Sequence, residues 1–450
     1  MNIAVTELSE LQQYLGDRDI FNLDAVTLPV EVASMSLWNT IDHEVRDRIL
    51  AGMLRNMLRR TIAHVPFYKY NAAWSNFSVE QISTLRDLFR LPLVSKDAIP
   101  GTGTPTRSGI HGFREKVIAN PEILVPDNLM QIIDLQERAN PHHEQILAKY
   151  KGKKILEFHS GGSQGRSTIT RLSYLSVEME AHALVRCLRM NGFQEGQSIA
   201  CFYNEEHKGG LQLERAADIM GMPFHSKRLI FDHLGSQGYT HAILGFQRAL
   251  AQGRDAGSYA QEIRQGIRDY IRQHKINIIE SVQPPPQFVQ KNIKGNALAF
   301  MSLYEEDFSA FESVSHVFLT GFPVPLSTVQ RLRKDGKVVS TTWGSTEAMA
   351  LGTHSLAADS NVNNLIATPF PSIGIVAKYN ERGLLQPSLR TVMEKESGLL
   401  LVTSLLGAGS TYINYLIGDI ATHHKMGFTN IHRLSSKTIS GSCAADALAI

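Results

Sequence analysis

The chain has 450 residues, of which 43% are hydrophobic and 20% are charged, and its net charge is +2. This composition is typical of a globular protein with one large multi-lobed domain or two to three smaller ones. The charge balance is too mild to indicate binding to nucleic acid or to an anionic membrane. No apolar run is long enough to span a bilayer, and the N-terminus lacks the pattern of a signal peptide. The three cysteines are far apart and odd in number, which predicts reduced thiols and a cytoplasmic location.

The first third of the chain predicts helices followed by a long loop. Val45, Ile49, Met53 and Met57 recur every four residues, which predicts a helix over about 40–60. A second short helix is expected from Ser78, as its cap, to Phe89. Residues 101–120 are rich in Gly, Thr, Pro and Arg, and the whole of 101–150 is interpreted as a loop or insertion.

A glycine-rich stretch, His-Ser-Gly-Gly-Ser-Gln-Gly-Arg-Ser over 159–167, stands between two strand-like runs at 154–158 and 168–172. Glycines let backbone N–H groups approach an anion without obstruction by a Cβ atom, and the hydroxyls and Arg166 add donors. This pattern suits a polyphosphate. Walker and Rossmann loops open directly into a helix, so neither fits here. The alternative is a glycine-rich surface turn.

Strand and helix patterns alternate over the rest of the chain. This alternation predicts an α/β fold in which mixed or parallel sheets are flanked by helices, with no clear linker between independent halves. Strands are expected at 198–202, 276–282, 316–319, 338–342 and 399–402, and helices at 175–190, 262–274 and 326–334.

Three further segments carry polar side chains at the ends of expected strands. In 341–347, Trp343 can pack on a purine or an aryl ring, and Glu347 is either a Mg²⁺ ligand or a carboxylate at the start of a helix. In 413–420, Asp419 is either an acceptor for a ribose diol or a turn residue. The segment 319–325 contains Gly321 and, taken alone, indicates only a turn.

The order of these segments resembles the adenylate-forming superfamily and, within it, the phenylacetate–CoA ligase family. The resemblance covers roughly 40–436 and implies a large N-terminal adenylate-forming domain over 1–435. In the family a mobile C-terminal lid follows the hinge and carries a lysine that bridges the acid and ATP. Here 436–450 is interpreted as a hinge stub and tail, so the resemblance implies a chain without that lid.

The resemblance also implies an activity. A carboxylic acid, aryl or otherwise apolar, would be activated by ATP and Mg²⁺ to an acyl-adenylate and transferred to a thiol such as coenzyme A. The implied catalytic residues are Thr346, Glu347 and Arg166, with Glu347 as the Mg²⁺ ligand. The implied ATP- and AMP-binding residues are Ser160, Gly162, Ser163, Gln164, Gly165, Gly321, Thr342, Trp343, Gly344, Ser345, Asp419 and Arg433. The implied acyl pocket contains His207, Gly209, Gly210 and Trp343, with a surface-loop histidine as the alternative for His207.

The chain departs from the family pattern at several positions. Arg166 stands for the family's lysine, Gln164 for a threonine, Phe322 for a glutamate, Trp343 for a tyrosine and Leu416 for an arginine. Two alternatives to the ligase interpretation follow. One is transfer of the acyl group to a cysteine, an amine or a partner protein, as in acyl-protein synthetases, with Cys443 as the candidate thiol. The other is a nucleotide- or acyl-binding pseudoenzyme. A partner protein that accepts the acyl group or supplies a lid, and a homodimer, are further expectations.

Overall fold

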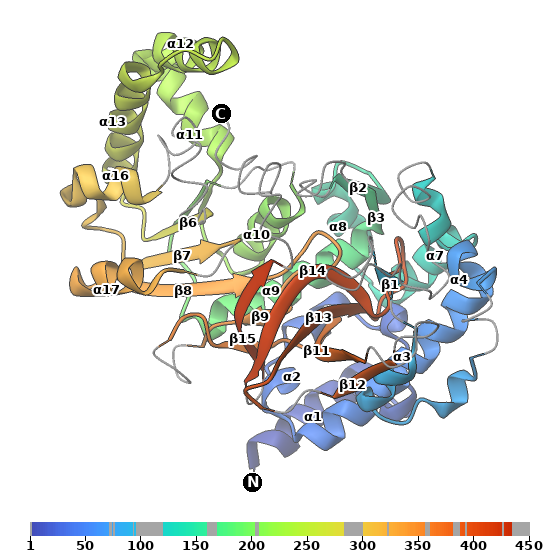
Figure 1. Cartoon of the computed structure of the whole chain (residues 1–450). Coiled ribbons are helices and arrows are strands. Elements are labelled where there is room, and N and C mark those ends of the chain that lie inside the picture. The colour runs from blue at the N-terminus through green and yellow to red at the C-terminus, as the bar shows by residue number, and fades with distance from the viewer. Residues whose placement is uncertain are drawn as a thin grey trace.

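The computed structural model of the chain describes residues 2–71, 74, 77–92, 94–95, 120–159, 169–202, 207–282, 300–321, 324–355, 361–380, 388–391, 394–424 and 427–433. Its centre is a 13-stranded sheet, and a separate two-stranded sheet lies beside it (Figure 1). Within these ranges, no helix is long and apolar enough to cross a membrane.

Helices begin the chain and pack against the antiparallel strands of its C-terminal third (Figure 1). They are α1 (Asn2–Leu15), α2 (Leu37–Thr40), α3 (His43–His64) and α4 (Pro66–Lys69), with short 3₁₀ turns between α1 and α2. The predicted helix at 40–60 is confirmed as α3, which buries Ile49, Met53 and Met57 on one face. The Asp42 carboxylate caps it by accepting from the backbone N–H groups of Glu44 and Val45.

The short helix expected at 78–89 is wrong. Two 3₁₀ turns occupy this segment, η4 (Val79–Gln81) and η5 (Leu85–Arg90), and Ser78 makes no capping hydrogen bond. The physical reason is a competing cap inside the segment. Asp87 Oδ2 accepts from the backbone N–H groups of Ser83 and Thr84, which starts a new turn there.

The expectation of a loop over 101–150 is wrong for its second half, while 101–119 lies outside the described residues. Residues 121–149 form η6 (Pro121–Leu124), α7 (Leu129–Ala139) and α8 (His143–Lys149). In α7, Leu129, Ile132, Ile133 and Gln136 are buried at helical spacing. The polar residues between them conceal this apolar face in the sequence.

The parallel half of the main sheet contains β4 (Ile199–Cys201), β5 (Phe224–His225), β6 (Ile278–Val282), β7 (His316–Thr320) and β8 (Val338–Trp343). Their order is β5-β4-β6-β7-β8, and each neighbouring pair is parallel. The strands predicted at 198–202, 276–282, 316–319 and 338–342 therefore exist, with boundaries shifted by one or two residues. Their carboxyl ends lie at one edge of the sheet.

Helices cover both faces of these parallel strands, which explains their nearly continuous apolar sequences. On one face, α9 (Tyr174–Met190) and α10 (Lys208–Ile219) pack on Ile199, Ile278 and Phe318. The opposite face, formed by Ile279, Val317 and Val339, meets a second helical layer. This layer comprises α11 (Lys227–Leu234), α12 (Thr240–Ala251), α13 (Gly257–His274), α16 (Phe300–Glu306) and α17 (Leu326–Lys334). Figure 1 shows α11, α12 and α13 as a projecting arm at the upper left.

The remaining strands extend the sheet mainly by antiparallel pairing, and the strand expected at 399–402 is confirmed as part of a longer strand over Ser397–Ser404. They are β9 (Gly352–Thr353), β10 (Leu365–Ala367), β11 (Ser372–Asn380), β12 (Ser388–Thr391), β13 (Ser397–Ser404), β14 (Tyr415–His424) and β15 (Gly427–Arg433), and the short β1 (Val94–Ser95) pairs in parallel with β14. Their order is β12-β11-β13-β14-β15-β10-β9, and β9 joins them to β8. The two halves form one sheet whose junction is the β8–β9 hairpin.

Candidate functional site

A pocket opens at the carboxyl ends of β7 and β8, with about 310 Å³ of space that includes its open mouth. Its lining residues are Gly321, Thr341, Thr342, Trp343, Asn363, Leu365 and Ile431. Three residues predicted to bind ATP or AMP, Gly321, Thr342 and Trp343, therefore lie together. They meet because parallel strands end at the same edge of the sheet.

Trp343 is the last residue of β8, and its indole is mostly buried. Phe428 of β15 packs edge to face against it, with ring centroids 5.9 Å apart. The Thr342 hydroxyl is hydrogen-bonded to the hydroxyl of Thr353 at 2.7 Å, and Asn191 donates to Thr353. These contacts fix the end of β8 before the chain turns into β9.

The turn between β8 and β9 contains the predicted residues Gly344, Ser345, Thr346 and Glu347. Ser345 and Ala348 exchange backbone hydrogen bonds of 2.8 and 3.1 Å, which close the turn. A Cβ atom at Gly344 would lie 2.9 Å from the backbone nitrogen of Ala350, so this close approach requires glycine. Thr346 and Glu347 are buried in the turn. Glu347 is not at the start of a helix, which removes that alternative.

His207 and Tyr412, which come from other elements, lie close enough to Glu347 to interact with it electrostatically. Burial lowers the His207 pKa and raises the Tyr412 pKa, and the Glu347 carboxylate acts to raise both. Tyr412 is fully buried and shares a 2.9 Å hydrogen bond with the hydroxyl of Thr170. Thr170 belongs to the strand that follows the glycine-rich stretch. Tyr412 therefore links this strand to the Glu347 turn.

His207 is the N-cap of α10 and is half-buried. Its Nδ1 accepts from the backbone N–H of Gly209 at 3.1 Å, and this bond requires an unprotonated Nδ1. Burial, with a smaller contribution from the neighbouring Lys208 ammonium, lowers the His207 pKa to about 4. The predicted acyl-pocket residues Gly209 and Gly210 form the first turn of the same helix. The imidazole is therefore neutral at pH 7 beside the Glu347 turn.

The glycine-rich stretch joins β2 (Ile155–His159) to β3 (Ile169–Ser173), and these strands pair antiparallel. The two strands predicted on either side of it are thus confirmed. The predicted phosphate-binding residues themselves lie outside the described residues. They are Ser160, Gly162, Ser163, Gln164, Gly165 and Arg166.

Segment 408–410 holds β3 in place. Ser173 N–H donates to the Ala408 carbonyl at 2.9 Å, and Arg171 exchanges two hydrogen bonds with Ser410. Gly409 has φ +140°, and a Cβ atom there would lie 2.2 Å from the Arg171 carbonyl oxygen. Only glycine allows this close approach. The contact places β3, the strand that follows the glycine-rich stretch, relative to Tyr412 and Glu347.

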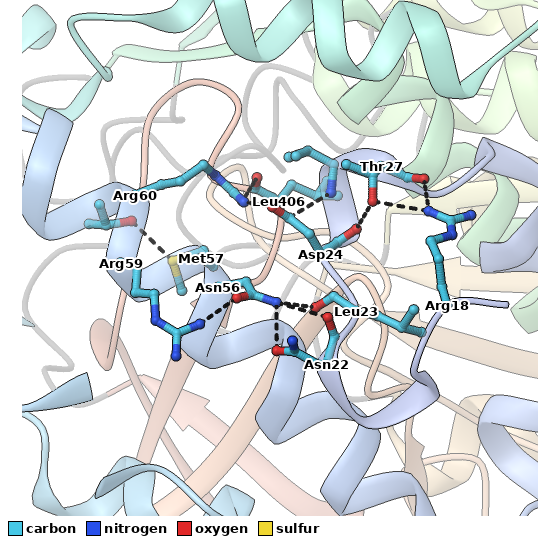
Figure 2. A network of polar contacts seen from close by, with 12 residues as sticks. Arg18, Asn22, Leu23, Asp24, Thr27, Asn56, Met57, Arg59, Arg60 and Leu406 are labelled. Carbon is cyan, nitrogen blue, oxygen red and sulfur yellow. Dashed lines mark hydrogen bonds and ion pairs between the residues drawn. The ribbon is translucent and has the colours of Figure 1, made fainter. Parts of the chain in front are cut away.

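The N-terminal helices support the same segment through the polar network of Figure 2. The Arg60 guanidinium pairs with Asp24 and donates to the Leu406 carbonyl at 3.3 Å. Asn56, one turn earlier on α3, donates to the carbonyls of Asn22 and Leu23. Burial lowers the Arg60 pKa, and Asp24 opposes this shift. The first 60 residues therefore fix the segment that positions β3.

Asp419 and Arg433 face one another across the β14–β15 ladder and form a pair in its register. Asp419 is buried. Ile431, two residues before Arg433 on β15, lines the pocket. Arg433 thus ends the strand that carries Ile431, and Asp419 lies on the neighbouring strand β14.

Among the described residues, no group of three or more His, Cys, Asp or Glu side chains could hold a metal ion. This finding concerns sites built from these four kinds of side chain within those ranges. It is compatible with Mg²⁺ held by one carboxylate together with water and substrate phosphates, which is the usual way proteins bind this ion with nucleotides. Glu347 is a suitable carboxylate because it is buried at the turn that follows the pocket wall.

Solved structures of a 2-hydroxyisobutyryl-CoA ligase resemble this chain. The open form in complex with 2-HIB-AMP and CoA superimposes with a TM-score of 0.53 at 13% identity over 86% of this chain. The post-adenylation form with 2-HIB-AMP gives 0.55 at 15% identity over 86%. The chain has the fold of these CoA ligases. The fold expected from the order of the motifs is thus confirmed.

The match to this ligase fold spans 73% of the first ligase chain and 66% of the second. No family model matches the sequence. No curated protein matches it either. The similarity therefore lies in the three-dimensional fold, and in the sequence it is indicated by the order of short motifs.

The sequence interpretation missed several residues around this ligase-fold site. Asn363 lines the pocket and exchanges hydrogen bonds of 2.8 and 2.9 Å with the backbone of Val324, but no motif surrounds it. Tyr412 was missed because it lies just before the segment 413–420, and no motif includes it. Glu280, on β6, is a buried carboxylate that accepts from Thr320 at 2.8 Å and from Cys201 at 3.2 Å. A single glutamate inside an apolar run was the signal that could have identified it.

Proposed function

We propose that the chain uses ATP and Mg²⁺ to activate a carboxylic acid as an acyl-adenylate and then transfers the acyl group to a thiol such as coenzyme A. One observation carries the proposal. Gly321, Thr342 and Trp343 line one pocket, and Thr346 and Glu347 follow in the turn beside it. This arrangement belongs to a fold seen in ligase structures whose names include an acyl-AMP and coenzyme A.

In the first step, a carboxylate oxygen of the acid attacks the α-phosphorus of ATP. The bond from that phosphorus to the bridging oxygen breaks, and pyrophosphate leaves with the electron pair. In the second step, a thiolate attacks the acyl carbon and AMP leaves. Reactions of this kind depend on positioning and on neutralisation of charge, which preorganised polar groups supply.

The chain's own residues take the following roles in this proposal. Trp343 packs beside the adenine and the acid, and Thr346 contacts the α-phosphate. Asp419 accepts from the ribose hydroxyls, and Arg433 lies near them. Glu347 holds Mg²⁺, which neutralises phosphate charge. The neutral His207, with Gly209 and Gly210, borders the acid.

Two further sets of contacts complete the proposal. Gly344 and Ser345 contact the adenosine, and the phosphates are bound by Ser160, Gly162, Ser163, Gln164, Gly165 and Arg166. We further propose that the acid is aryl or otherwise apolar, and that a partner protein accepts the acyl group or supplies a lid. Transfer of the acyl group to Cys443, a homodimer and a cytoplasmic location are also predictions.

Acid-dependent exchange of labelled pyrophosphate into ATP tests the proposal. The acid panel should include aryl, branched-chain and hydroxy acids, because the pocket lining combines apolar and hydroxyl side chains. We expect exchange with at least one acid and a loss of about 100-fold or more in Glu347→Gln. Asp419→Asn should raise the KM for ATP about tenfold, which corresponds to one lost hydrogen bond to a charged group.

The matched control is Glu80→Gln. This replacement removes an exposed carboxylate that pairs with Arg59 far from the pocket. It should leave exchange unchanged. If ATP binds while no acid supports exchange, the ligase proposal is wrong and the chain is a nucleotide-binding protein.

A further inference from the structure

A buried ammonium lies directly beneath the Glu347 turn. We propose that Lys208 is a positioning residue for acid activation: its ammonium holds the Thr346 carbonyl and thereby sets Glu347 relative to Mg²⁺ and ATP. This inference rests on the proposed function and deepens it. Neither the motifs nor the family resemblance assigns a role to Lys208.

The contacts of Lys208 saturate its head group. The side chain is 0% exposed, and its Nζ lies 2.8 Å from one carboxylate oxygen of Glu180, 3.0 Å from the other and 3.1 Å from the Thr346 carbonyl oxygen. An ammonium has three N–H donors, so these acceptors can use all of them. Gln212, one turn along α10, donates to the same Glu180 carboxylate. The ammonium is therefore held from α9 and α10 at once.

The acceptor in the turn is the carbonyl of the peptide bond that joins Thr346 to Glu347. Because a peptide unit is planar, fixing this oxygen also fixes the Glu347 N–H and the directions of both flanking Cα atoms. The hydrogen bonds between Ser345 and Ala348 close the turn on itself. The bond from Lys208 ties it to the two helices beneath.

A purely structural purpose explains this pair poorly. Replacing a buried ion pair by apolar side chains of similar volume often leaves stability unchanged or raises it. An apolar pair could fill the space between α9 and α10, but it could not donate to the Thr346 carbonyl. That donation is the property that distinguishes a lysine at this position.

The same two helices provide an internal control. Arg215 of α10 pairs with Glu178 of α9 at 2.7 Å, and Arg215 also pairs with Asp218. These partners lie on α9 and α10, and Tyr150, which follows α8, donates to Glu178 at 2.7 Å. This second pair joins the helices in a similar way, and its hydrogen bonds within the described ranges go to other elements than the Glu347 turn.

The experiment compares two charge-neutral double variants of the full chain. The first is Lys208→Met with Glu180→Gln, in which the amide keeps a partner for Gln212. The second is Arg215→Met with Glu178→Gln, in which the amide keeps a partner for Tyr150. For each, circular dichroism and thermal denaturation establish folding. The Mg²⁺ concentration that gives half-maximal pyrophosphate exchange is then measured together with kcat.

We expect the first variant to fold, to need about tenfold more Mg²⁺ and to lose about 10- to 100-fold in kcat, because small misplacements of reacting groups cost that much. The second variant should keep its half-maximal Mg²⁺ within about twofold of the native value. The proposal is overturned if the first variant folds with native Mg²⁺ dependence and kcat. It is also overturned if both variants shift equally, since the effect would then be general loosening.

Two further measurements keep the result decisive. If the first variant does not fold, an all-apolar Lys208→Met, Glu180→Leu, Gln212→Leu variant replaces it, with the same expected shift. If the native chain shows no exchange, the proposed function has failed, and the inference is judged by calorimetry with ATP at varied Mg²⁺. Weaker Mg²⁺-dependent ATP binding in the Lys208 variant alone would support the positioning role, and identical binding would reject it.

Discussion

The two ion pairs that join α9 to α10 differ in the further partner that the basic residue of each pair contacts. Glu180 and Lys208 are 2% and 0% exposed, and the lysine continues to a backbone carbonyl in the turn that carries Glu347. Glu178 and Arg215 are 3% and 10% exposed, and the arginine continues to Asp218 near the surface. One pair connects the helices to the candidate site, and the other connects them to the periphery. Similar burial of charge can therefore serve different purposes within one helix interface.

The largest expected effect is on stability in Lys208→Met alone. This replacement leaves the Glu180 carboxylate buried without its countercharge, and breaking a buried pair in this way costs about 3–5 kcal/mol. Urea unfolding monitored by circular dichroism should show this loss. A loss below about 1 kcal/mol would mean that water reaches the Glu180 carboxylate. The Lys208–Glu180 pair would then not differ from the Arg215–Glu178 pair in its effect on stability.

Arg215→Met should cost less, roughly 2–3 kcal/mol. The Glu178 carboxylate would keep the hydrogen bond from Tyr150, and the greater exposure of Arg215 indicates that water can reach the vacated position. The same unfolding measurement applies. If Arg215→Met is more destabilising than Lys208→Met, the order of the two pairs proposed here is reversed.

The pH dependence of stability should also distinguish the Lys208–Glu180 pair from the Arg215–Glu178 pair, because His207 is next to Lys208 in the chain. The folded-state pKa of about 4 lies below the usual 6.5, so the stability that depends on neutral His207 is fully present above about pH 6.5 and is lost as the pH falls toward 4. We expect roughly 1–2 kcal/mol of loss over this window, because the side chain is only partly buried by its exposed area. Stability measured at several pH values checks this.

His207→Asn is the control, since asparagine keeps an N-cap acceptor but does not titrate. The loss between pH 6.5 and 4 should shrink in this variant. Removing the Lys208 ammonium should raise the His207 pKa and move the loss to higher pH, whereas removing Arg215 should leave the window in place. Identical curves for both variants would contradict the assignment of Lys208 as a cause.

The smallest effect is expected at an exposed pair. Arg59 and Glu80 are 43% and 70% exposed, and solvent screens their attraction even at 2.7 Å. Arg59→Met should change the free energy of unfolding by less than about 0.5 kcal/mol. This variant sets the lower limit of the scale. A change above 1 kcal/mol would indicate that the hydrogen bond from Arg59 to Asn56, in the network of Figure 2, contributes to the stability of the whole chain.

The sequence alone predicted the parallel half of the sheet because each of its strands is buried on both faces and therefore reads as an apolar run. The strands expected at 276–282 and 316–319 are examples. The resemblance to the adenylate-forming superfamily implied that Gly321, Thr342 and Trp343 bind one nucleotide, and the structure places all three in the lining of one pocket. The helices over 129–149 escaped notice because their apolar faces are narrow and interrupted by charged residues.

Local sequence therefore determined most strands of the parallel half, their ends to within one or two residues, and the side chains that follow them. Only the tertiary structure decided how those ends are held. Gly409 admits the backbone of β3, Tyr412 joins Thr170 to the surroundings of Glu347, and Lys208 meets a carboxylate of α9 and a carbonyl after β8. The reason is physical. Strand formation depends on neighbours within a few residues, whereas the burial of a charge depends on partners that only the folded chain brings into contact.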